Sequence, residues 1–190
     1  SQQLGKALVY FPWKGLNVVR EYVIPSNPQT TAQNTQRGYV TAAVAAIHAA
    51  QGRTTGGLAA IDVQAYALWA SVVQAATTWF NQAVKNWLDQ KVAGKIPVIF
   101  RDMAALPKAG GLNVKGDMTE ESSTVVSGAL YYGTSKTALV NSKACAKVQL
   151  QGTMPIDGLT AGVKYYVQYR CTGPAGFIGS NSGIYYGRPT

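Results

Sequence analysis

The sequence predicts an α+β protein with two parts of different secondary structure. Residues 1–95 begin with two short apolar β runs and continue into alanine-rich stretches whose apolar residues recur at helical spacing. Residues 96–190 consist of short β runs separated by Gly, Ser, Asp and Pro, the pattern of a small β-sandwich. We therefore expect a β-hairpin and helical module followed by a sandwich, with the boundary near Gly94–Pro97.

The N-terminal hairpin is predicted from two β runs, residues 6–11 and 16–23, joined by Pro12–Gly15. A four-residue loop of this kind is most often built on a type I turn. Apolar residues fall on both faces of the second run, and a lone hairpin is marginal in water. The hairpin must therefore pack on its own helices or on a neighbouring chain, where it would add a strand to another sheet. The sequence leaves both interpretations open.

A rigid corner and a long helix follow the hairpin. Pro25 and Pro28 stop the strand and disfavour helix in the residues just before them. Thr30 has a side chain preferred at the N-cap, and residues 31–51 have the helical pattern, ended by Gly52.

Two further helices complete the first part. One starts near Asp62, the predicted N-cap, and another starts at about Thr78 and ends at Gly94. His48 is the single histidine and is assigned a structural role, because no second His or Cys lies near it in the sequence. Aromatic residues at helical spacing are assigned to the core: Trp69, Trp79 and Trp87.

In the second part, six short β runs are predicted. They are residues 98–103, 112–115, 124–132, 145–150, 163–171 and 183–186. The two cysteines, Cys145 and Cys171, are too far apart in sequence for a zinc motif. They are consistent with one disulfide in a sandwich or with buried free thiols.

Composition and charge restrict the classes of function. The 190 residues are 47% hydrophobic and only 13% charged, with 20 Gly and 11 Tyr, a balance that suits extracellular or virion proteins. The net charge of +9 is spread along the chain without a block of five like charges, so we expect no dedicated nucleic-acid site. No apolar run approaches the ~20 residues that span a bilayer, so we expect no membrane segment.

The sequence offers no pattern for catalysis. It contains no Gly-rich phosphate loop, no G-x-S-x-G motif and no Cys/His pairing. The acidic residues of the second part fall on presumed loops without a partner pattern: Asp102, Asp117, Glu120, Glu121 and Asp157. We therefore expect a protein that is not an enzyme, with no cofactor and no metal.

The stretch from Leu159 to Tyr165 resembles the end of strand E and the start of strand F in fibronectin type III and related immunoglobulin-like domains. That pattern reads Leu, Pro, Thr and Tyr at alternate positions, and here Ala161 and Val163 replace the Pro and the Thr. The resemblance implies an Ig-like sandwich over about the last 90 residues. Tyr165 would be the tyrosine-corner residue, with its hydroxyl tied back to the preceding turn.

The first 95 residues resemble a family of phage, prophage and bacterial proteins. The shared signature is an aromatic-Lys-Gly turn, then Val-Val-Arg, then Asn-Pro-x-Thr-x-x-Gln and a later Arg. The matching residues here are Trp13–Gly15, Val18–Arg20, Asn27–Thr30 with Gln33, and Arg37. The resemblance implies a virion or surface structural role and supplies no catalytic residue.

These features lead to a hypothesis of a tailed-phage virion protein that binds other virion subunits or copies of itself. A capsid decoration or minor head protein is favoured over a tail or tube component. The alternatives are a surface adhesin that binds host glycans, with stacking faces from Tyr131, Tyr132, Tyr185 and Tyr186, or a self-assembling filament subunit. The expected location is the virion, assembled in the host cytoplasm, or else the cell surface. The predicted assembly interface consists of Trp13, Lys14, Arg20, Tyr22, Asn27 and Pro28.

Overall fold

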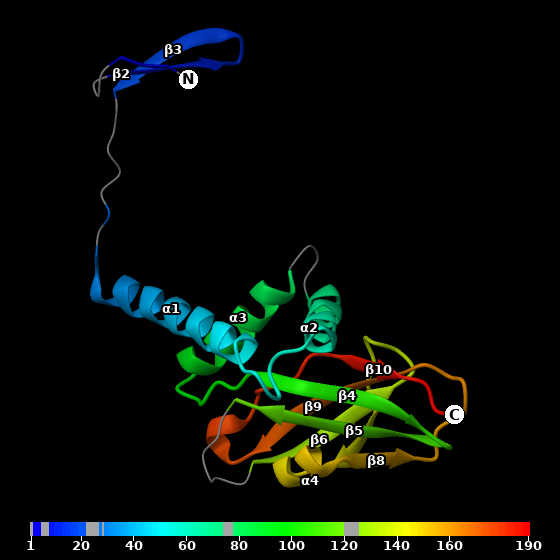
Figure 1. The fold of residues 1–190 in the computed structure, drawn as a ribbon. Coiled ribbons are helices and arrows are strands. Elements are labelled where there is room, and N and C mark those ends of the chain that lie inside the picture. The colour runs from blue at the N-terminus through cyan, green and yellow to red at the C-terminus, as the bar shows by residue number, and fades with distance from the viewer. Residues whose placement is uncertain (1, 5–7, 22–26, 28, 74–77, 120–125) are drawn as a thin grey trace. The chain divides into compact units, whose positions relative to one another are not determined.

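The α+β class is confirmed by the structure, a computed structural model in which helices and antiparallel sheets both occur (Figure 1). The residues that it describes are 2–4, 8–21, 27, 29–73, 78–119 and 126–190. The chain forms two compact units, Ser1–Thr35 and Gln36–Thr190. The boundary expected near Gly94–Pro97 lies inside the second unit, because helices and sheets pack together there.

The first unit contains a small antiparallel sheet in the order β1-β2-β3. Its strands are β1 (Gln2–Leu4), β2 (Leu8–Trp13) and β3 (Leu16–Glu21). The sequence predicted β2 and β3 but not β1. Helix α1 (Thr31–Gln51) begins in this unit, and its first turn is capped as predicted: the Gln33 N–H donates to Thr30 Oγ1 at 3.3 Å.

The second unit opens with the helical layer. It contains the rest of α1, then α2 (Ala60–Val73) and α3 (Trp79–Val92). Thr78 caps α3 by accepting a hydrogen bond from the Asn81 N–H at 3.2 Å, and Gly94 follows the helix at φ +71°. The helix therefore starts near Thr78 and ends near Gly94, as predicted. The three helices share an apolar cluster whose buried members are Ala43, Ile47, Ala50, Tyr66, Ala83, Trp87 and Ile99.

Two antiparallel sheets form the rest of this unit, in the orders β4-β5-β8 and β10-β9-β6-β7. The strands of the first sheet are β4 (Phe100–Lys108), β5 (Gly111–Met118) and β8 (Met154–Asp157). Those of the second are β6 (Ser127–Gly133), β7 (Asn141–Ala144), β9 (Tyr165–Gly173) and β10 (Tyr185–Gly187). Residues of both sheets share one hydrophobic core, including Phe100, Met103, Leu112, Leu130, Ile156, Val167 and Tyr169.

One strand expectation is wrong. Residues 145–150 do not form a strand; they lead into a short helix, α4 (Lys147–Gly152). Val148 and Leu150 alternate in the sequence like strand residues, but only Leu150 is buried while Val148 is 67% exposed. Gln149 stabilises the start of this helix, because its side-chain Oε1 accepts a hydrogen bond from the Ala146 N–H at 2.9 Å.

The helices are joined to the sandwich by a buried carboxylate, Asp62. It is the third residue of α2 and not its N-cap, and its Oδ2 accepts from the Ala59 N–H at 2.8 Å. The same carboxylate accepts the N–H groups of Asp102 (3.0 Å) and Met103 (3.1 Å), where β4 has a bulge and Asp102 adopts φ +50°. The Tyr185 hydroxyl from β10 donates to Oδ1 at 2.6 Å. One side chain therefore connects α2, β4 and β10.

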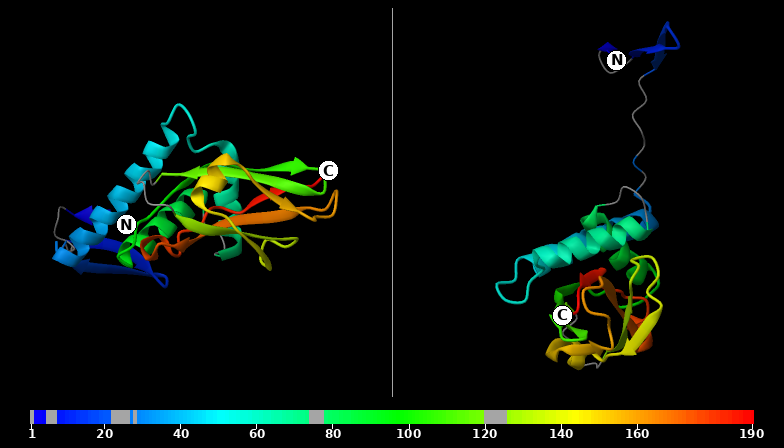
Figure 2. Two further views of the ribbon diagram at one scale, coloured as in Figure 1. Left: turned by 90° about the horizontal axis from the view of Figure 1, so that it is seen from below. Right: turned by 90° about the vertical axis from the view of Figure 1, so that its right-hand side faces the viewer.

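Backbone contacts reinforce this junction. The Ile184 N–H donates to the Ala65 carbonyl at 3.0 Å, and a Cβ on Gly183 would lie 2.6 Å from the Ala65 carbonyl carbon. Glycine at position 183 is thus required by the close approach of β10 to α2. The Phe100 N–H donates to the Tyr66 hydroxyl at 3.1 Å. Figures 1 and 2 show α2 and α3 on the same side of the sandwich.

We expect Asp62→Asn to destabilise the second unit strongly. An amide NH₂ would face backbone N–H donors and leave at least one buried donor unpaired, which costs about 2–4 kcal/mol of unfolding free energy. Urea denaturation followed by circular dichroism measures the loss. Asp89→Asn is the matched control, because Asp89 is exposed and its carboxylate pairs with Lys85 on the surface of α3. Its effect should be about 0.5 kcal/mol or less. Equal effects of the two substitutions would contradict the role of Asp62.

The loss of unfolding free energy caused by Asp62→Asn is also predicted to depend on pH. Burial raises the pKa of Asp62 above its ordinary value, although hydrogen bonds from Tyr185 and three backbone N–H groups oppose the rise. The native state then holds this proton more tightly than the unfolded chain, whose Asp pKa is about 3.9. The tighter binding of this proton therefore adds fully to the free energy of unfolding below about pH 3.9, and this contribution is lost as the pH rises through the native pKa of Asp62. The cost of Asp62→Asn, measured by urea denaturation between pH 3 and 8, should therefore decrease with rising pH.

Candidate assembly surface

The N-terminal sheet is built on a tighter turn than expected. Lys14 and Gly15 have φ values of +49° and +80°, and Trp13 pairs directly with Leu16, so the loop has two residues and not four. Positive φ at both central positions is the type I′ geometry, whose twist matches that of the flanking strands. Pro12 is accommodated inside β2 because β1 pairs only with Leu8–Tyr10 and leaves β2 uncovered at Pro12.

Apolar side chains cover both faces of this sheet. Directly paired residues of an antiparallel sheet share a face, so Trp13 and Leu16 lie together, while Tyr10 and Val19 lie together on the opposite face. Trp13 is 60% exposed and Leu16 70% exposed. Val19 and Tyr10 are exposed as well. Large apolar side chains so exposed on a small sheet are typical of a surface that another molecule covers.

A cation lies beside the aromatic residues. The Arg20 guanidinium is 5.4 Å from the centre of the Phe11 ring, a cation–π contact, and both side chains lie on the face of Trp13 and Leu16. Arg and aromatic residues are the types most enriched where protein interfaces are strongest. The surface therefore has the composition of an interface as well as its exposure.

The structure brings together three of the six predicted interface residues. Trp13, Lys14 and Arg20 are exposed on the sheet, and Asn27 is exposed on the segment between β3 and α1. The other two, Tyr22 and Pro28, lie outside the described residues. Sequence reasoning did not include the exposed apolar residues Tyr10, Leu16 and Val19, although the apolar residues on both faces of the second β run were a signal for them.

The tyrosines considered as glycan-stacking faces are not equivalent. Tyr185 is buried and bonded to Asp62, and Tyr132 packs against the sandwich core. Lys164 Nζ lies 3.9 Å from the centre of the Tyr186 ring, and the Arg170 guanidinium 4.4 Å from that of Tyr131. A ring face of each of these two tyrosines is thus occupied by a cation from the chain itself.

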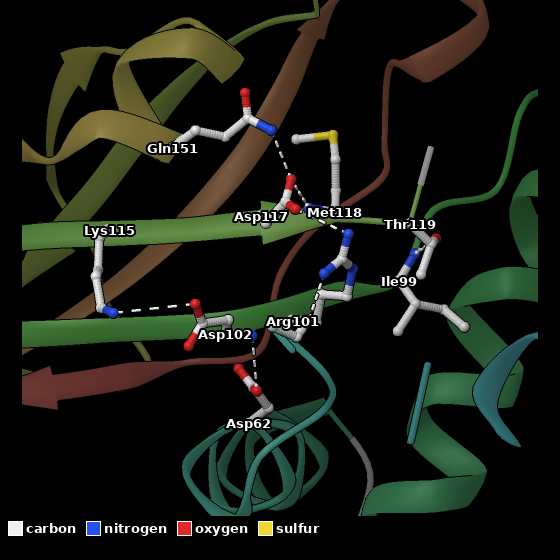
Figure 3. A network of polar contacts seen from close by, with 10 residues as sticks. Asp62, Ile99, Arg101, Asp102, Lys115, Asp117, Met118, Thr119 and Gln151 are labelled. Carbon is white, nitrogen blue, oxygen red and sulfur yellow. Dashed lines mark hydrogen bonds and ion pairs between the residues drawn. The ribbon is translucent and has the colours of Figure 1, made fainter. Parts of the chain in front are cut away.

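Asp102 and Asp117 of the sandwich have structural partners (Figure 3), and Asp157 pairs with Lys108. Asp117 pairs with the buried Arg101 at 2.8 Å and accepts a hydrogen bond from Gln151 at 2.8 Å. Arg101 also donates to the Gly56 carbonyl, which joins the segment before α2 to β4. Asp102 lies 3.9 Å from Lys115. Glu120 and Glu121 lie outside the described residues.

The remaining candidates for a metal site, a membrane segment and a reactive side chain have structural explanations or are not met in the described residues. Within the described ranges, no three His, Cys, Asp or Glu side chains gather closely enough to hold a metal ion. None of the described helices combines the length and apolarity needed to cross a bilayer. His48 is exposed, with its ring 6.0 Å from that of Phe80. Cys145 and Cys171 are buried free thiols, and burial raises their pKa values to about 11 and about 12.

Comparison with known proteins gives no assignment: neither the scan of protein-family models nor the search of curated proteins returns a match.

We expect the paired substitutions Trp13→Ser and Leu16→Ser to weaken any association of the chain. They remove the two most exposed large hydrophobic side chains of one face while leaving the Lys14-Gly15 turn unchanged. Sedimentation velocity over a concentration series measures the change. The control is Val148→Ser, which removes an exposed apolar residue from α4 instead. An equal effect of the control, or none from the pair, would contradict the surface.

Proposed function

We propose that this chain is a non-enzymatic structural subunit of a tailed-phage particle, most simply a capsid-surface decoration or minor head protein. The N-terminal sheet would anchor the subunit on its neighbours, and the sandwich would project. The resemblance of the first 95 residues to phage and prophage proteins supplies the virion context.

The observation that carries the proposal is the exposed apolar surface of the first unit. This sheet bears Trp13 and Leu16 on one face and Tyr10 and Val19 on the other, all of them exposed. A three-stranded sheet needs a buried hydrophobic face for stability, and each large apolar side chain that becomes buried contributes about 1.5–3 kcal/mol. Contact with a neighbouring subunit supplies that burial.

The sandwich supports the projecting role. Its strand orders, β4-β5-β8 and β10-β9-β6-β7, are those expected if the seven strands correspond in sequence to A, B, C, C′, E, F and G of a fibronectin type III domain. The Tyr165 hydroxyl accepts a hydrogen bond from the Thr160 N–H at 3.2 Å, which ties β9 to the turn before it. Both features are consistent with the Ig-like resemblance. They would give the particle a rigid external domain.

The acidic residues support a structural role over catalysis. Asp62 and Asp117 are held by hydrogen bonds and ion pairs that join separate elements. A general acid or base needs an atom that donates or accepts a proton within reach of a substrate. Asp62 is completely buried, so no substrate reaches it.

Deleting residues 1–21 should abolish higher assembly and leave a folded monomer. The deletion removes the exposed sheet but none of the buried residues of either core cluster. Size-exclusion chromatography with light scattering gives the mass of each species, and the near-ultraviolet circular dichroism of the full chain and the truncated chain checks that the second unit is intact. An unchanged assembly profile would refute the anchoring role.

A further inference from the structure

Strand β3 has an unprotected edge. It is the last strand of the order β1-β2-β3, and its six residues pair with β2 without a register shift. Among the described strands, none pairs with its other side. Natural sheets protect such edges with charged side chains, lysine above all, with proline, with a bulge or by keeping the strand very short. Strand β3 has six residues and no proline, lysine or register shift, and its charged residues, Arg20 and Glu21, lie at its C-terminal end.

The edge strands of the sandwich provide a contrast. Strands β7 and β8 each have only four residues, and they carry Lys143 and Pro155 respectively. Strands β4 and β10, at the remaining edges of the two sheets, contact each other. The same chain therefore protects the edges of one unit and leaves β3 open in the other.

The turn determines which backbone groups face outward. A two-residue type I′ loop closes on a hydrogen-bonded pair, here Trp13 with Leu16. Hydrogen-bonded and non-hydrogen-bonded pairs alternate along an antiparallel ladder. Leu16, Val18 and Arg20 therefore bond to β2, while Asn17, Val19 and Glu21 present their N–H and C=O groups at the open edge.

These outward groups are self-complementary. A two-fold axis perpendicular to the sheet and passing at Val19 pairs Val19 with itself and Asn17 with Glu21 of a second copy. All three outward residues then form hydrogen bonds, and the Asn17 amide faces the Glu21 carboxylate. With the axis at Val18, only Asn17 and Val19 would form hydrogen bonds between the two copies. With the axis at Arg20, two guanidinium groups would lie directly opposite each other, which is unfavourable.

We propose that two copies of this chain associate through their β3 edges, with Val19 on the two-fold axis, to form one continuous six-stranded sheet. The proposal rests on the assembly role of the N-terminal sheet and identifies the partner as a second copy of the same strand. The charge pattern favours this occupant, because the two-fold register places no like charges directly opposite. The closed contact is of the isologous type that most homodimers use.

Val19→Pro tests the edge directly. Proline removes the outward N–H at the axis, and the bonds from β3 to β2 persist because Val19 does not donate to β2. The matched control is Val19→Thr, which keeps the β-branched shape and the N–H. Analytical ultracentrifugation of the full chain should show a dimer dissociation constant at least tenfold higher for the proline variant and within about threefold of wild type for the threonine variant.

Disulfide trapping gives a second test that does not depend on how the proline variant folds. Val19→Cys places two thiols opposite each other on the axis, within the Cα separation that a disulfide allows. Leu16→Cys is the control: its side chain is 70% exposed, but the two copies would lie about 20 Å apart, six residues along the paired strands. The native Cys145 and Cys171 are buried and do not compete.

The outcomes separate this inference from the proposed function. Rapid oxidation of Val19→Cys to a dimer, with little from Leu16→Cys, supports edge pairing. Equal trapping of both variants, or of neither, overturns it. If deletion of residues 1–21 reduces assembly while Val19→Pro and Val19→Cys behave like wild type, the sheet assembles through its faces and only the edge contact is refuted. If the deletion also has no effect, the assembly role itself is refuted.

Discussion

The organisation of the second unit depends on burying one carboxylate, Asp62, between a helix and two sheets. Its oxygens accept N–H groups from a β4 bulge and the Tyr185 hydroxyl from β10, and in the described part of the chain these partners are neutral. A buried carboxylate without hydrogen bonds is very unfavourable. The arrangement therefore holds only if helix, bulge and strand are all correctly placed, which makes the helical layer and the sandwich depend on each other.

This dependence explains why the boundary expected from composition falls inside the second unit. The change from alanine-rich helices to β runs near residue 95 is real. Helix α1 was predicted with its capping residue Thr30, and α3 with its start at about Thr78. The secondary structure changes near residue 95, but the helices before this point and the strands after it pack together in one unit. The partners of Asp62 on β4 and β10 lie 40 and more residues away in sequence, and neither a β-bulge nor a long-range hydrogen bond has a local sequence pattern.

Only part of the candidate surface could be predicted from the sequence. Trp13, Lys14 and Arg20 could be identified because a turn signal and flanking β runs are local features, and local chemistry dominates a hairpin. The turn length was missed because Pro12 suggests a loop, whereas β2 tolerates it beyond the end of β1. β1 itself was missed because three residues are too few for a periodic pattern.

The two units differ in how far they bury their apolar side chains. In the second, apolar residues of both sheets converge on one core, and buried polar groups such as Asp62 and Arg101 bond between elements that are distant in sequence. In the first, the described strands have cross-strand pairs but expose apolar side chains on both faces. Such a sheet gains little by folding alone, since exposed pairs contribute only about 0.2–1 kcal/mol each. Its stability therefore depends on a contact that buries these apolar side chains.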